Sequence, residues 1–196
     1  MENEVKEPAL QYNFITPEEY LAAERIATEK HEYYRGEIFA MSGASVNHNK
    51  IFRKLFLALG HQLKGRDCQP YGSDLRIHIP MNTLYTYPDI SIICGEPELA
   101  DDQFDNIINP SVIIEILSKS TRNYDKGEKF TLYRDIDTLQ EYILVDSDKI
   151  HIEKHIRNKD NSWQLTEFKS IENSLLINTV NVQIELRDIY ESLSFE

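Results

Sequence analysis

Cysteine, long apolar runs and positive charge are scarce in this sequence, and each scarcity excludes a class of protein. The chain has two cysteines, Cys68 and Cys94, without the CxxC spacing typical of zinc sites. We expect both to be buried, reduced side chains and not a disulfide pair. No apolar run approaches the roughly 20 residues of a membrane helix, and no charged-then-apolar signal segment opens the chain. These features predict a cytoplasmic protein without a membrane partner.

The charge balance is acidic. Lysine and arginine number 21 and aspartate and glutamate 33, which gives a net charge of −12. A protein that coats nucleic acid non-specifically is normally basic, so the balance argues against that class but leaves room for a local basic groove. With 196 residues, 41% hydrophobic and 28% charged, the chain predicts one globular domain. We place it at 13–196, after a flexible segment at 1–12.

Apolar periodicity predicts a mixed sheet packed between helices, an α/β (α+β) fold. Capping residues and apolar spacing favour helices near 17–30, 45–65 and 125–136. Short apolar runs predict strands near 68–71, 74–79, 89–94, 111–117 and 141–146. Alternating residues at 150–168 predict an additional C-terminal hairpin with one solvent-facing side.

Two carboxylates occur inside strands, where an unpaired charge is costly. Glu115 lies within VIIEIL, whose apolar neighbours on both faces predict a central strand, and Asp89 follows Pro88 where the next apolar strand begins. Two acids at the ends of neighbouring strands form an oxygen site suited to Mg²⁺ or Mn²⁺. The alternative is that each acid caps a loop or pairs with a buried arginine, since Pro-Asp is also a common turn dipeptide.

Lys129 is a third candidate. Asp125 and Glu128 resemble a capping box, which places Lys129 in the first turns of a helix, where the helix dipole disfavours a cation. A nearby phosphate or carboxylate would explain it, and an ordinary solvated lysine is the alternative. We interpret Asp125 as a cap and not as a ligand.

Three weaker signals lie nearer the N-terminus. Glu37 is set among aromatic and apolar residues, and His48 lies on the core-facing side of its helix. That helix also carries Lys50 and Lys54 on one flank, a stripe that could meet a phosphate backbone. Surface exposure, a helix-start histidine and a solvated helix face are the respective alternatives.

An ordered series of motifs resembles the Uma-two (Uma2) family of restriction-like endonucleases, a branch of the PD-(D/E)XK nuclease superfamily. The motifs are YPDISIICG at 87–95, NPSVIIEILS at 109–118, YDKGEKF at 124–130 and QEYILVD at 140–146. His31-Glu32-Tyr33, Gly36-Glu37-Ile38, Met41, His48 and the 73–76 strand fit the same family. The resemblance covers roughly residues 16–193.

The resemblance implies a restriction endonuclease-like fold with a divalent-metal site at the strand ends. Asp89 and Glu115 match the family's metal ligands, and Glu37 matches an N-terminal acid that joins them. Leu117 stands where related nucleases carry a lysine, and Lys129 matches the position thought to replace it, with Lys119 as a rival.

The activity implied is hydrolysis of DNA phosphodiester bonds with Mg²⁺ or Mn²⁺, by a homodimer that cuts both strands. Two alternatives stay open at this point. One is a nucleic-acid-binding or regulatory module that has lost catalysis, and the other is a structural domain that self-associates through the 150–168 hairpin.

Overall fold

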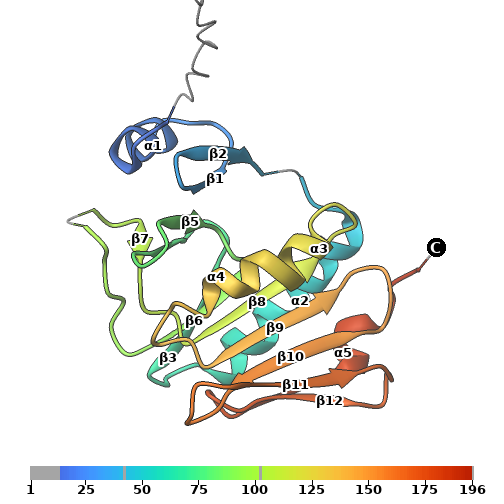
Figure 1. Ribbon diagram of the computed structural model, residues 1–196. Helices are drawn as coiled ribbons and strands as arrows, with labels where there is room; N and C mark the ends of the chain where they lie inside the picture. Colours follow the sequence, from blue (N-terminus) through green and yellow to red (C-terminus); the bar gives the residue numbers. More distant parts are fainter. Residues whose placement is uncertain (1–13, 42, 102, 196) are drawn as a thin grey trace, which may run out of the picture.

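The computed structural model describes residues 14–41, 43–101 and 103–195, so the expected flexible segment at 1–12 lies outside the described residues. Within these residues no helix has the length and apolarity to cross a membrane. The strands form a six-stranded central sheet, a five-stranded N-terminal sheet and a two-stranded ribbon (Figure 1). The predicted mixed sheet flanked by helices is therefore confirmed.

The central sheet has the order β11-β10-β9-β8-β6-β3. Its strands are β3 (Cys68–Gly72), β6 (Ile90–Cys94), β8 (Val112–Leu117), β9 (Glu141–Asp146), β10 (Ile152–Arg157) and β11 (Trp163–Phe168). Only β8 and β9 pair in parallel. The predicted C-terminal hairpin is β10–β11, and it extends this sheet.

The N-terminal sheet has the order β2-β1-β5-β4-β7. Its strands are β1 (His31–Tyr34), β2 (Glu37–Ala40), β4 (Arg76–Ile79), β5 (Leu84–Thr86) and β7 (Asn106–Ile107). The separate ribbon pairs β12 (Ser174–Ile177) with β13 (Val182–Glu185). The sequence contains no clear signal for β12.

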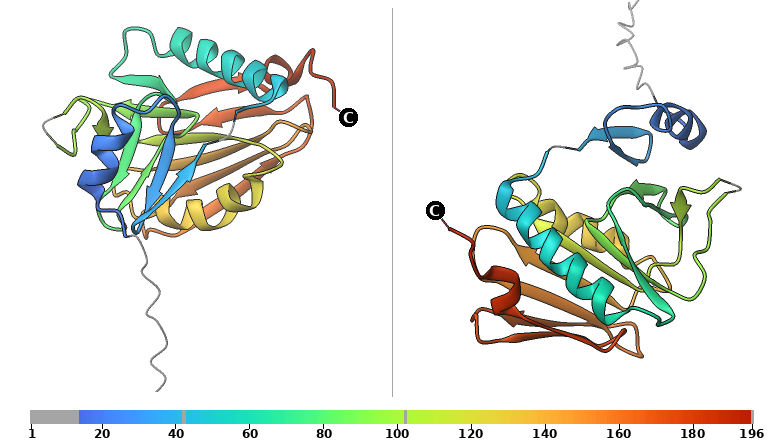
Figure 2. Two further views of the ribbon diagram at one scale, coloured as in Figure 1. Left: turned by 90° about the horizontal axis from the view of Figure 1, so that it is seen from above. Right: turned by 180° about the vertical axis from the view of Figure 1, so that it is seen from behind.

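Helices cover both faces of the central sheet, as the two views of Figure 2 show. The helices are α2 (Val46–Gln62), α3 (Arg122–Tyr124), the π-helix η1 (Asp125–Lys129), α4 (Phe130–Tyr133) and α5 (Leu186–Tyr190), whereas α1 (Pro17–Glu24) packs against the N-terminal sheet. The apolar stripe of α2 packs with Val112, Ile114 and Ile116 of β8 in one core. Ile113 and Leu117 face the other core, beside α4. Strand alternation therefore places Glu115 on the α4 side.

The expectation of two reduced cysteines is wrong, because Cys68 and Cys94 form a disulfide. The antiparallel register of β3 and β6 sets these two residues directly opposite each other, which brings their side chains together. Their 26-residue separation in the sequence does not reveal this pairing.

The prediction of a helix capped by Asp125 is also wrong. The helical segment begins at Arg122, and Asp125 lies inside it, buried, at the start of the π-helix η1. The backbone carbonyl of Asp125 accepts a hydrogen bond from the Tyr142 hydroxyl at 2.9 Å. A π-turn shifts the helical register by one residue, so the spacing of side chains on this segment differs from that of a regular α-helix.

Candidate active site

Four carboxylates from different elements and one lysine come together at β8, an interior strand of the central sheet. The carboxylates are Glu32 of β1, Asp89 just before β6, Glu115 of β8 and Asp125 of η1, and we call them the acidic cluster. Glu32, Glu115, Asp125 and the central Lys129 are all buried. Chain segments about 80 residues apart in sequence thus converge on one small, highly charged site.

Lys129 binds three members of the cluster directly. Its Nζ lies 2.9 Å from Oε1 of Glu115, 2.9 Å from Oε1 of Glu32 and 3.8 Å from Oδ1 of Asp125. Burial alone would lower the pKa of Lys129, but the neighbouring carboxylates raise that pKa well above its usual value. The ammonium therefore stays charged and holds β1, β8 and η1 together.

Both oxygens of Glu115 have hydrogen-bond donors. The Tyr133 hydroxyl donates to Oε1 at 2.8 Å, and the backbone N–H of Asp89 donates to Oε2 at 3.2 Å. Burial raises the pKa of Glu115 to about 8, against the opposing effect of Lys129. A carboxyl with a pKa near neutrality inside a cleft of charged groups is typical of functional sites.

Asp89 forms the solvent-facing side of the cluster, with 21% of its side chain exposed. Its Oδ2 accepts a hydrogen bond from the backbone N–H of Ile116 at 2.8 Å and lies 3.2 Å from Nε2 of His48. Burial lowers the pKa of His48, but the neighbouring Asp89 raises it, and the net result is a raised pKa. These contacts fix Oδ2 and leave Oδ1 without a hydrogen bond to any described residue, free for a ligand.

The structure brings Asp89, Glu115, Lys129 and His48 together but does not bring Glu37 into the cluster. Glu37 is exposed on β2, and Glu32 on the paired strand β1 contacts Lys129 instead. The register pairs Glu37 with Tyr34, two residues beyond Glu32 on the same face of the sheet. Glu37 therefore lies toward the hairpin turn, where side chains reach solvent.

The remaining lysines named from the sequence lie outside the acidic cluster. Lys54 donates to the backbone carbonyl of Glu191, which ties α2 to the segment after α5. Lys50 is half-buried on the same helix, and Lys119 is exposed in the loop that follows β8. Lys129, and not Lys119, is the lysine that meets Glu115.

The sequence analysis missed Glu32 and Asp125 as members of the cluster. Glu32 is only 8% exposed and accepts a hydrogen bond from the hydroxyl of Thr86 on β5. Its signal was a carboxylate in a short strand next to Tyr33, whose ring is part of a tyrosine core. Asp125 was interpreted as a helix cap, although its spacing of four residues from Lys129 places both side chains on one face of a helix.

The donor set suits a hard divalent cation. The cluster offers four carboxyl groups, and carboxylate oxygens are the ligands that Mg²⁺ and Mn²⁺ prefer. Asp89 and Glu115 would hold such an ion from neighbouring strands, with Oδ1 of Asp89 on the open side. A second group of potential ligands, His151, Glu153 and Glu167, is less suitable, because Lys126 and Lys169 already neutralise its two carboxylates.

Comparison with known proteins supports this assignment of the fold. The family model Uma2, described as "Putative restriction endonuclease", matches residues 17–187. The uncharacterised protein slr1290 of Synechocystis is 36% identical over 188 residues, covering 96% of this chain and 97% of its own. The uncharacterised protein sll1609 of Synechocystis is 40% identical over 153 residues, covering 78% of this chain and 86% of its own.

A solved structure has the same fold. It is the crystal structure of a "putative nuclease belonging to DUF820" from Anabaena variabilis, with a TM-score of 0.73 and 17% sequence identity. The match covers 88% of this chain and 96% of the other. The architecture is therefore restriction endonuclease-like.

Proposed function

This chain belongs to the Uma2 family, and from that membership we propose that it is a divalent-metal-dependent endonuclease that hydrolyses phosphodiester bonds of DNA. The observation that carries the proposal is the contact between Lys129 and Glu115 at 2.9 Å, beside the half-open Asp89. A lysine next to two strand-end acids supplies the charges that phosphodiester hydrolysis needs. Leu117, where related nucleases carry a lysine, is then no obstacle to catalysis.

Asp89 and Glu115 would hold Mg²⁺ or Mn²⁺, which when bound polarises the phosphate and makes water more acidic. Lys129 stabilises the negative charge that develops on the phosphate oxygens. His48 and the Ile116 N–H hold Asp89 in place, and Tyr133 holds Glu115. In the reaction, a water oxygen attacks phosphorus, one phosphorus–oxygen ester bond breaks, and the proton lost by water passes through solvent to the departing oxygen.

Calorimetry with Mn²⁺ and Mg²⁺ tests the proposal first. We expect Glu115→Gln and Asp89→Asn to lose metal binding at least tenfold, because each removes a charged ligand. Glu37→Gln is the matched control, since it removes an exposed acid outside the cluster. Circular dichroism checks that each variant is folded.

Cleavage of a mixed DNA substrate then tests the reaction. We expect the wild type to cut DNA only with the divalent ion, and Lys129→Gln to bind the ion but to cut at least 100-fold more slowly. Metal-dependent cutting that survives in both acid variants would overturn the proposal. Metal binding without turnover on any DNA or RNA would instead favour a module that has lost catalysis.

The proposal includes two further points from the sequence. We propose that the substrate is DNA cut by a homodimer, because a two-fold symmetric protein presents one site to each strand of a duplex. The cytoplasmic location stays a prediction.

A further inference from the structure

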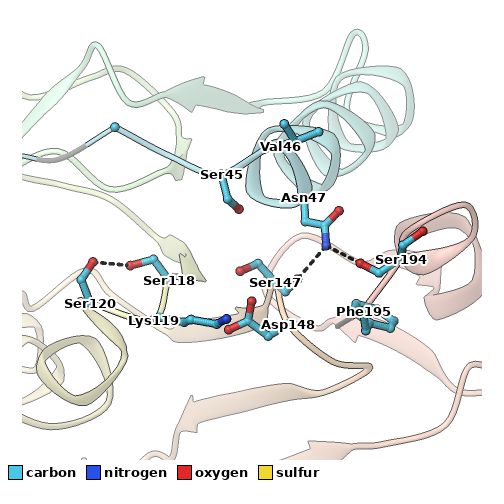
Figure 3. Close-up of a pocket in the computed structure, with 11 residues that line it drawn as sticks. Ser45, Val46, Asn47, Ser118, Lys119, Ser120, Ser147, Asp148, Ser194 and Phe195 are labelled. Atoms are coloured by element: carbon cyan, nitrogen blue, oxygen red, sulfur yellow. Dashed lines mark hydrogen bonds between the residues drawn. The ribbon is translucent and has the colours of Figure 1, made fainter.

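A cavity of about 540 Å³ lies at the start of α2 and has no role in the reaction described above (Figure 3). Its walls come from the start of α2, the loop after β8, the turn after β9 and the C-terminal segment. We call it the serine cavity, after Ser45, Ser118, Ser120, Ser147 and Ser194, which line it together with Lys119.

The serine cavity and the acidic cluster are built on the same two segments. Ser45 is the N-cap of α2, three residues before His48, and its hydroxyl accepts a hydrogen bond from the His48 N–H at 3.2 Å. Ser118 follows Glu115 by three residues at the end of β8, a distance of roughly 10 Å along an extended strand. A polymeric substrate that has one phosphate at Asp89 therefore passes close to the cavity.

The chemistry of the walls suits an anion with several oxygens. The Ser45 oxygen accepts from His48, so the Ser45 O–H remains available as a donor. Ser118 lies 3.0 Å from Ser120 and 2.9 Å from Thr121, a chain of hydroxyls that can turn their protons toward a ligand. Hydroxyl and ammonium groups are common donors to phosphate oxygens in protein–DNA contacts.

The charges around the cavity leave one lysine uncommitted. Lys119 is exposed and forms no ion pair with any residue in the described part of the chain, and its ammonium points toward the cavity. The one carboxylate in the walls, that of Asp148, pairs at 2.9 Å with Arg122, which also pairs with Asp146 at 2.8 Å. Lys119 thus remains free to bind an anion.

We propose that the serine cavity binds a phosphate group of the substrate strand, next to the bond that is cut, with Lys119 as its cationic partner. This inference rests on the proposed function and adds a positioning contact to it. The group bound is either an internal backbone phosphate or a terminal phosphate, and the two sources share the same chemistry.

Binding of labelled oligonucleotides to the full-length protein, measured by fluorescence anisotropy with Ca²⁺ at several salt concentrations, tests the inference. We expect Lys119→Ala to weaken binding and to reduce the slope of log K against log salt by about 0.9 for duplex DNA or about 0.7 for a single strand, the value for one lost phosphate contact. Lys159→Ala, in the exposed turn between β10 and β11, is the matched control and keeps the wild-type slope.

Modified oligonucleotides then identify the source of the phosphate. If the cavity binds an internal phosphate, a neutral methylphosphonate at one position removes the difference between wild type and Lys119→Ala. If it binds a terminal phosphate, removal of the 5′-phosphate does so. A difference that survives every such change, or a Lys119→Ala slope equal to that of the wild type, overturns the inference.

The outcome is separable from that of the proposed function. If the wild type binds and cuts DNA and Lys119→Ala does so equally well, only the proposal that the serine cavity binds phosphate is overturned. A wild type that binds no nucleic acid in the presence of the divalent ion overturns both proposals.

Discussion

At the scale of single residues, the hydroxyl of Tyr133 holds the carboxyl group of Glu115 in place. It is fully buried and donates to Glu115 at 2.8 Å. Hydrogen bonds to charged groups contribute about 1.5–3 kcal/mol. We expect Tyr133→Phe to lower the free energy of unfolding by about 2 kcal/mol, measured by urea denaturation.

Tyr71→Phe is the control for this substitution. Tyr71 is half-buried on β3, and its hydroxyl makes no hydrogen bond among the described residues. We expect its removal to change stability by less than about 0.5 kcal/mol. Equal losses in the two variants would show that the Tyr133 hydroxyl does not stabilise Glu115.

At this scale the sequence was sufficient to predict site residues where a charged side chain interrupts an apolar strand. Glu115 and Asp89 were predicted because their neighbours are apolar, and the structure places both at the same site. Glu32 was not predicted, although its tripeptide fits the family, because a four-residue strand shows too little alternation to separate it from Glu37. The family assignment favoured the wrong acid of the hairpin for the same reason.

Among the elements, η1 was the least predictable. The sequence suggested a regular helix from Asp125, and a π-turn leaves no periodic signal in five residues. Tyr142 on β9 hydrogen-bonds the Asp125 carbonyl, a contact between residues 17 apart. The π-turn is thus fixed by tertiary contacts, which a pattern search along one segment does not detect.

The disulfide between β3 and β6 carries a prediction at the element scale. Closing a loop of this length stabilises a fold by about 3–4 kcal/mol in the chain-entropy account. We expect Cys68→Ser/Cys94→Ser, or reduction of the wild type, to lower the urea midpoint accordingly. As a control, the reductant should not change the urea midpoint of the double variant, which has no disulfide to reduce. Two free thiols per chain in oxidised, denatured protein would contradict the pairing.

The packing of β10 against α4 makes stability depend on pH. His155 lies with its ring centroid 4.4 Å from that of Phe130, and burial lowers its pKa. The unfolded chain then binds more protons than the folded chain, so the free energy of unfolding falls as pH drops below about 6.5.

We therefore expect acidification from pH 7.5 to pH 5.5 to lower the Tm of the wild type relative to that of His155→Gln, with each kcal/mol equivalent to about 2–4 °C. His61→Gln, on the exposed surface of α2, serves as the control and should follow the wild type. If both variants lost stability to the same extent on acidification, burial of His155 would not be the cause.

At the scale of the whole molecule, the central sheet was predictable, whereas for the N-terminal sheet the sequence predicted individual strands, such as β4, but not how the strands pair. Long apolar runs such as that of β8 identify buried strands without ambiguity. The N-terminal sheet instead joins strands of two to four residues from distant parts of the chain, such as β4 and β7. Such pairings depend on the fold itself, because so few residues contain little local signal.

An end strand of the central sheet is a candidate interface for the dimer proposed above. β11 is an end strand of the central sheet, and its Leu165 is 51% exposed. Open strand edges favour pairing with another chain. We expect light scattering after gel filtration to give twice the 22.9 kDa of one chain, and Leu165→Lys to halve it. Leu57→Lys, an exposed leucine on α2, should leave the dimer intact, and a monomeric wild type would refute the prediction.

The ion pairs of Lys129 join the two large sheets, because Glu32 belongs to one and Glu115 to the other. The β1–β2 hairpin consequently cannot be exchanged independently of the rest of the fold. Grafting a hairpin without an acid at the Glu32 position would remove a carboxylate from the acidic cluster and loosen the joint between the sheets in one step. Protein engineers who recombine members of this family should therefore place their crossover points after η1, so that Glu32, Glu115 and Lys129 come from one parent.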